Sequence, residues 1–244
     1  MELDTTPAVV RDPVQDGLEA TAKQGSDVTM MGAISAESAL SADGSLLSGE
    51  TAYALRVAIT AQRAQISDGE RSAHYYVNID DGARLNAVSK AFQERMATRE
   101  AQYHQARDAA IDELLAASAP VIDPHIPSAK VASTAALLRD ALNLGASPEA
   151  LVKEAVARND NIALHHLLGD SLWPLLLAKR TDVRSLRVSA AEQRWAAGQD
   201  FPGSKLLAFL CGDGGSLGAQ AKDAAVAKFN AVKRSATIKR KSGR

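Results

Sequence analysis

The chain has 244 residues, of which 46% are hydrophobic, 23% charged and only 4% aromatic. Its formal net charge of -1 excludes a histone-like polycation and an acidic, chaperone-like polyanion, and one cysteine excludes an intramolecular disulfide or a cysteine-rich zinc site. The charge is unevenly distributed, because residues 1–70 hold eleven acidic and four basic residues whereas residues 224–244 hold seven basic and no acidic ones. This gradient predicts interaction segments at the two ends of the chain.

Residues 1–48 are rich in Ser, Ala, Gly, Thr and Asp, and their apolar residues follow no sustained period. Because such a segment buries too little surface to offset its ordering entropy, we expect a flexible acidic arm over 1–48. Its first residues, MELDTTPAVVRDP, lack the apolar core of a secretory signal, and no stretch of the chain approaches the ~18 apolar residues of a membrane span. We therefore expect a protein without a membrane partner, located in the cytoplasm or within a macromolecular particle.

The segment 49–118 is predicted to be helical, although residues 74–79, HYYVNI, suit an extended conformation. A long amphipathic helix is expected over 80–118, with Arg99 as the one polar interruption of its apolar stripe. The apolar residues that recur at three- and four-residue steps include Leu85, Val88, Phe92, Met96, Tyr103 and Leu114. A narrow stripe on so long a helix is typical of a coiled-coil or bundle seam, so these residues are predicted to mediate self-association or contact with a helical partner.

The stretch 119–127 contains three prolines and predicts a linker, which is the best internal boundary in the chain. Short helical patterns joined by turns then predict a compact all-α domain over 128–215. Within it, Ser147 and Pro148 form a typical helix start, and a capping-box pattern at Ser189 predicts the start of another helix.

The last segment, 216–244, is predicted to be a helix that ends at about residue 236 and runs into an unstructured basic tail. Its basic residues without a neighbouring acid are Lys228, Lys233, Arg234, Lys239, Arg240, Lys241 and Arg244. We expect them to contact nucleic-acid phosphates without sequence specificity, or an acidic protein surface. The acidic arm of the chain itself, in the same copy or in a neighbouring one, is a third target.

Four other patterns could carry chemistry: a Gly-rich loop over 211–218, His165-His166 with Asp170, Asp123 with His125, and Cys211. The loop matches neither of the Gly-rich phosphate-binding patterns, and neither histidine group has a third metal ligand at a recognisable spacing. The apolar context of the cysteine, LLAFLCG, favours a buried structural thiol over a nucleophile. We therefore expect no metal, no cofactor and no enzymatic activity.

These patterns together predict an all-α protein with a long, coiled-coil-like helix, a compact multi-helix domain, a flexible acidic N-terminal arm and a basic C-terminal tail. The predicted function is that of a non-enzymatic structural or assembly protein that acts through self-association and its charged ends. In organisation the chain resembles viral scaffolding and other virion assembly proteins, which implies an assembly role. The alternative is a nucleic-acid-associated protein that binds phosphates through its tail, and an enzyme with an unrecognised helical site is a lesser alternative.

Overall fold

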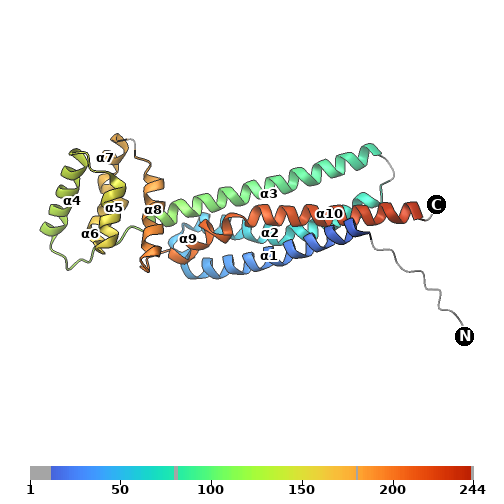
Figure 1. The fold of residues 1–244 in the computed structure, drawn as a ribbon, viewed down its shortest axis with the longest axis horizontal. Coiled ribbons are helices and arrows are strands. Elements are labelled where there is room, and N and C mark those ends of the chain that lie inside the picture. The colour runs from blue at the N-terminus through green and yellow to red at the C-terminus, as the bar shows by residue number, and fades with distance from the viewer. Residues whose placement is uncertain (1–11, 80–81, 180, 243–244) are drawn as a thin grey trace, which may run out of the picture. The chain divides into compact units, whose positions relative to one another are not determined.

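A computed structural model describes residues 12–79, 82–179 and 181–242, with side chains described as far as Thr237 at the C-terminal end. Over these residues the protein is all-α, as predicted, with ten α-helices, short 3-10 turns and no strand (Figure 1). No helix in the described part of the chain is long and apolar enough to cross a membrane. The chain divides into two compact units, and three of the four divisions between them fall inside long helices, while the fourth follows Gly212.

Unit 1 consists of Met1–Glu37, Leu55–Gln105 and Asp213–Arg244. Its helices are α1 (Pro13–Asp43), α2 (Gly49–Val77), α3 (Gly82–Ala117) and α10 (Leu217–Ser242), of which the first three continue into unit 2. The long helix expected over 80–118 is thus present as α3. Helix α10 extends beyond the predicted end of the last helix, which agrees with the high helix propensity of its Ala, Lys and Arg residues.

Helix α1 corrects the prediction of a flexible arm over 1–48, of which residues 1–11 lie outside the described part. The helix begins at Pro13, and the carboxylate of Asp12 accepts a hydrogen bond from the backbone N–H of Val14 (3.0 Å), as an N-terminal cap does. Its buried positions are Ala22, Thr29, Ala33, Ala36 and Leu40. These positions have helical spacing, but most side chains are small, so α1 is stabilised by close packing rather than by bulky apolar residues.

The core of unit 1 joins α2, α3 and α10. Phe229 of α10 stacks on Phe92 of α3 with ring centroids 4.6 Å apart, and Tyr76 of α2 meets Phe229 edge to face at 5.5 Å. These contacts keep residues 74–77 in α2, where the sequence predicted an extended segment, because tertiary packing overrides local β-propensity. Helices also approach closely at Gly25 and Gly69, where an added Cβ would lie 2.7 Å from the Ala224 Cβ and 2.5 Å from the Ala225 carbonyl oxygen, respectively.

Unit 2 consists of Ser38–Ala54 and Ala106–Gly212. Its short helices are α4 (Ser128–Asn143), α5 (Pro148–Ala157), α6 (Asn161–Leu168), α7 (Trp173–Ala178), α8 (Val183–Ala196) and α9 (Ser204–Cys211). Ser147 caps α5 as predicted, and Asp160 and Asp182 accept backbone N–H groups at the starts of α6 and α8. The predicted helix start at Ser189 is wrong, because this residue lies in the middle of α8.

The proline-rich stretch 119–127 holds no helix, but it is not a boundary between the compact units. It lies inside unit 2, and the same unit includes residues 106–117 of α3. The Ser118 carbonyl accepts a hydrogen bond from Arg194 (2.8 Å), and the Pro120 carbonyl lies 2.8 Å from His165 Nδ1. These contacts attach the start of the stretch after α3 to unit 2, so the prolines interrupt a helix without separating the compact units.

Candidate functional site

The predicted self-association stripe on α3 is covered mainly by the chain itself. Leu85 and Val88 are partly buried, whereas the other four residues, Phe92, Met96, Tyr103 and Leu114, are almost completely buried. Phe92 and Met96 belong to the core of unit 1, and the Tyr103 hydroxyl donates a hydrogen bond to the Gly214 carbonyl (2.6 Å). This placement corrects the expectation of a free seam, because these four side chains already stabilise their own chain.

The described basic residues of the predicted tail also contact unit 1. Lys228 Nζ lies 3.8 Å from a Glu70 carboxylate oxygen, and Lys233 Nζ lies 4.9 Å from the centre of the Tyr76 ring. Arg234 donates a hydrogen bond to Asp12 (2.8 Å) and thereby lowers the pKa of this carboxyl group. The side chains of Lys239, Arg240 and Lys241, and the whole of Arg244, lie outside the described residues. Contact with the acidic N-terminal segment is therefore realised within the chain at Asp12.

A hollow of about 760 Å³ lies among α1, α2 and α10 of unit 1. Its lining includes apolar side chains, Ile66, Val77 and Val232, and charged side chains of both signs, among them Glu19, Lys23, Asp27, Glu70 and Lys228. Because carboxylates and ammonium groups both line this hollow, its charge selects neither an anion nor a cation.

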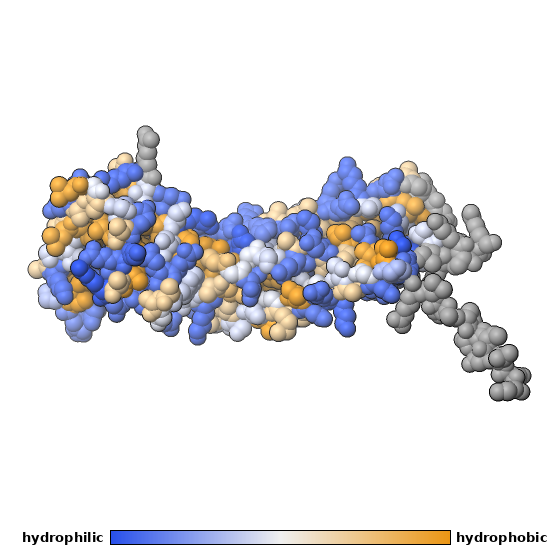
Figure 2. All heavy atoms as spheres, in the orientation of Figure 1, coloured by the Kyte–Doolittle hydropathy of each residue, from blue (hydrophilic) through white to orange (hydrophobic). Residues whose placement is uncertain are grey.

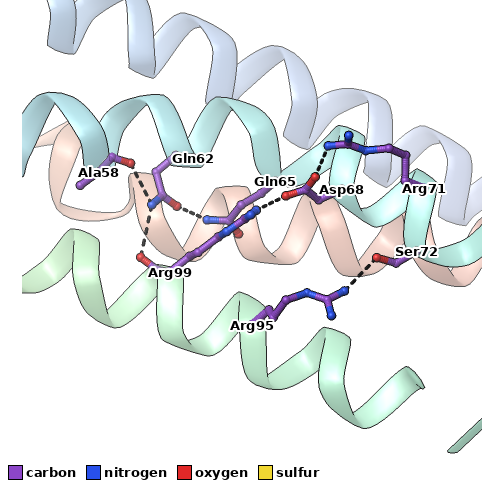
Figure 3. A network of polar contacts seen from close by, with 8 residues as sticks. All are labelled: Ala58, Gln62, Gln65, Asp68, Arg71, Ser72, Arg95 and Arg99. Atoms are coloured by element: carbon purple, nitrogen blue, oxygen red, sulfur yellow. Dashed lines mark hydrogen bonds and ion pairs between the residues drawn. The ribbon is translucent and has the colours of Figure 1, made fainter. Parts of the chain in front are cut away.

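A more selective arrangement lies between α2 and α3, where Arg71, Arg95 and Arg99 form an arginine cluster (Figure 3). One carboxylate oxygen of Asp68 accepts a hydrogen bond from Arg71 and the other accepts one from Arg99. Burial alone would raise the pKa of Asp68, but the hydrogen bonds and positive charges of Arg99 and Arg71 outweigh burial and lower it. Asp68 is therefore ionised at neutral pH and holds two of the three guanidinium groups in place.

Two fully buried glutamines support this cluster from the interior of unit 1. Gln62 Nε2 donates to the carbonyl oxygens of Ala58 (3.2 Å) and Arg99 (3.4 Å), so α2 is bonded directly to the α3 backbone at one of the arginines. Gln65 Nε2 donates to Gln62 Oε1 (Figure 3). Gln65 Oε1 is buried and has no hydrogen-bond partner among the described residues. Buried polar groups of this kind fix the relative position of two helices.

The arginine cluster borders a hollow of about 440 Å³, whose lining consists of Asp68, Arg71, Ser72, Tyr75, Val88, Ala91, Arg95 and Arg99. Arg95 donates to the Ser72 hydroxyl (3.1 Å). Sequence reasoning missed this site, since it treated Arg99 as an interruption of an apolar stripe. The only local signal was the four-residue spacing of Arg95 and Arg99, and nothing in the sequence placed Arg71 beside them.

The chemistry-bearing patterns of the sequence do not form a recognisable reactive centre. Cys211 was predicted to be buried, but as a residue it is exposed at the end of α9. Its thiol group is partly shielded from solvent, which raises the pKa of the thiol and makes Cys211 a poor nucleophile. His166 is buried, and its Nε2 lies 3.2 Å from the Val131 carbonyl oxygen. Because a carbonyl oxygen can only accept a hydrogen bond, Nε2 carries the proton of the neutral ring. Nδ1 then accepts a hydrogen bond from the Ser171 hydroxyl (2.9 Å). Burial lowers the pKa of His166. This hydroxyl–imidazole pair borders none of the hollows described above, which favours a structural role.

Metal binding has no support in the described part of the chain, where no group of three or more His, Cys, Asp or Glu side chains could hold an ion.

Comparison with known proteins gives no match to a family model, to a curated protein sequence or to a solved structure.

Proposed function

We propose that this protein is a non-enzymatic helical assembly protein that self-associates through an exposed apolar face of α1. The observation that supports the proposal is a cluster of large apolar side chains on unit 1, Val28, Met30, Met31 and Ile34, which are between 42% and 63% exposed. This cluster is called the α1 patch below. It replaces the α3 stripe as the candidate contact surface, because the α3 stripe is covered within the chain.

The α1 patch lies opposite the packed side of the helix. Thr29, Ala33 and Ala36 are completely buried, and at about 100° of helix rotation per residue Met31 and Ile34 lie on the opposite, exposed side. Val28 and Met30 lie on the two flanks of that exposed side. On the face shown in Figure 2, hydrophobic residues reach the surface as patches between hydrophilic ones. Single exposed apolar residues are ordinary, but four large ones within two turns of one helix are typical of a contact surface. Methionine side chains adapt readily to an apposed surface.

The partner that fits the α1 patch best is a second copy of the same helix. Lys23 lies before the patch and Glu37, which also pairs with Arg63 (2.9 Å), lies after it. When two copies of α1 pack antiparallel about a two-fold axis near residue 30, Lys23 of one copy faces Glu37 of the other at both ends. The two patches then cover each other, and this charge complementarity selects the antiparallel orientation.

Light scattering after size-exclusion chromatography tests the proposal. We expect the full chain to have about twice the monomer mass of 25.7 kDa, and Met31→Glu and Ile34→Glu each to yield the monomer mass. Leu137→Glu on α4 of unit 2 is the matched control, because Leu137 is also a large exposed apolar residue (69%) and its substitution should leave the mass of the complex unchanged. A monomer at high concentration, or a dimer that survives both α1 substitutions, contradicts the proposal.

A second function, non-specific association with nucleic acid, is favoured by the charge of the C-terminal end. Four of the last six residues are basic, and none of the last 21 is acidic. In an electrophoretic mobility assay, deletion of residues 238–244 should abolish the shift of a DNA or RNA probe. Such binding would combine with self-association in scaffold-like or virion assembly, within the cytoplasm or a macromolecular particle.

A further inference from the structure

We propose that the arginine cluster of Arg71, Arg95 and Arg99 binds a phosphate group. This inference is independent of the proposed self-association, because it concerns α2 and α3 and not the α1 patch. It rests on three guanidinium groups from two helices that border one hollow, on their excess positive charge, and on the buried contacts that hold them.

The first argument is the charge of the hollow. It has three positive groups and a single carboxylate, Asp68, which already binds Arg71 and Arg99. Arg95 donates to the neutral Ser72 hydroxyl (3.1 Å) and takes part in no ion pair among the described side chains. An adjoining hollow of about 410 Å³ adds the carboxylate of Glu94, which lies 3.8 Å from Lys90 Nζ. The arginine-lined hollow thus has an excess of two positive charges, which favours an anionic phosphate group.

The guanidinium groups of Arg71 and Arg99 are held in place before a ligand arrives. Asp68 lies between Arg71 and Arg99, and Gln62 bonds the backbone of Arg99 from the buried side. Because a guanidinium has five N–H donors, both arginines can donate to a phosphate oxygen while they remain bonded to Asp68. Ordering the donors in advance lowers the entropic cost of binding.

The third argument is the chemistry of the remaining lining. Guanidinium groups donate two parallel hydrogen bonds to phosphate oxygens, which makes arginine the preferred residue for phosphate recognition. Ser72 and Tyr75, which carry hydroxyl groups, line the same hollow, and so do the apolar residues Val88 and Ala91. The hollow, at about 440 Å³, is larger than a phosphate ion, so the group can be free phosphate or part of a nucleic-acid backbone.

Isothermal titration of the full chain with inorganic phosphate, at constant ionic strength against sodium chloride, tests the proposal. We expect Arg95→Ala to weaken phosphate binding at least ~10-fold, because it removes a guanidinium group that is bonded to the neutral Ser72 hydroxyl and not to a carboxylate. Arg139→Ala on α4 is the matched control, since it removes the same charge from an exposed site in unit 2 and should leave binding unchanged. Circular dichroism of both variants verifies that the helices are retained.

A second titration with a short oligothymidylate distinguishes the sources of the phosphate. If Arg95→Ala weakens binding of both ligands, the nucleic-acid backbone is the source; if it weakens only inorganic phosphate binding, free phosphate is the source. The proposal is overturned when the wild-type chain binds phosphate no better than chloride, or when Arg95→Ala and Arg139→Ala have equal effects on phosphate binding.

Discussion

Substitution of Gly69 by alanine tests the close packing of α2 on α10 that organises unit 1. A Cβ at this position would lie 2.5 Å from the Ala225 carbonyl oxygen and 3.3 Å from the Ala225 Cα. Both atoms belong to the backbone of α10, so no side-chain rotation relieves the clash and the helices must move apart. Gly17 on α1 is the matched control, because an added Cβ there meets nothing within 4 Å.

The two substitutions are expected to change stability in opposite directions. Alanine is favoured over glycine in a helix interior by about 1 kcal/mol, which applies at both positions. Overpacking a well-packed core costs about 1–3 kcal/mol, and contact with rigid backbone places Gly69→Ala at the upper end of this range. We therefore expect Gly69→Ala to destabilise unit 1 by about 2 kcal/mol and Gly17→Ala to stabilise it by about 1 kcal/mol.

Hydrogen exchange followed by mass spectrometry measures this effect in peptides from α2 and α10. The two tryptophans, Trp173 and Trp195, both lie in unit 2, so tryptophan fluorescence during urea unfolding monitors the other unit separately. Faster exchange of α2 and α10 in Gly69→Ala, with slower exchange of α1 in Gly17→Ala, is the expected outcome. If Gly69→Ala slows exchange as Gly17→Ala does, α2 and α10 do not approach as closely as described.

Two further predictions concern buried polar groups. Burial lowers the pKa of His166 below its ordinary value of 6.5, so the folded state binds a proton at this residue less readily than the unfolded state does. The contribution of neutral His166 to the stability of unit 2 is therefore fully present above pH 6.5. As the pH drops below 6.5, the free energy of unfolding should fall by up to about 1.4 kcal/mol per pH unit. Urea unfolding followed by tryptophan fluorescence between pH 7.5 and 5 should show this loss, and a His166→Gln variant with the same pH dependence would assign it to other groups. Tyr103→Phe removes the hydroxyl that donates to the buried Gly214 carbonyl and should destabilise unit 1 by about 1–2 kcal/mol. Faster hydrogen exchange in peptides from α3 should report this loss. An unchanged exchange rate would show that the 2.6 Å hydrogen bond does not contribute to stability.

The parts of the fold that sequence predicts well are those in which local chemistry determines the structure. Ser147 before Pro148 forms a helix start, and the expected cap is present at α5. The long helix over 80–118 follows from large apolar residues at regular steps, and it is present as α3 (Gly82–Ala117). In both cases the determining residues are near neighbours in sequence.

The parts that sequence does not predict depend on contacts between distant residues. The buried face of α1 consists largely of alanine and threonine, and α10 approaches the helix closely at Gly25. A search for large apolar residues therefore finds no period there. The extended propensity of residues 74–77 is overridden by the packing of Tyr76 on Phe229. The arginine cluster joins Asp68 of α2 to Arg99 of α3, and no local pattern relates these two positions.

The most direct test of antiparallel self-association through α1 is a distance measurement between spin labels in the assembled protein. Labels are placed at Val28→Cys or at Gly17→Cys in a Cys211→Ser background, since Cys211 is the single native cysteine. With a two-fold axis near residue 30 and helix axes about 10 Å apart, labels at position 28 should lie within about 20 Å of each other and labels at position 17 about 40 Å apart. Equal distances at both positions would indicate parallel helices, and the absence of any dipolar coupling at position 28 would contradict self-association through this face.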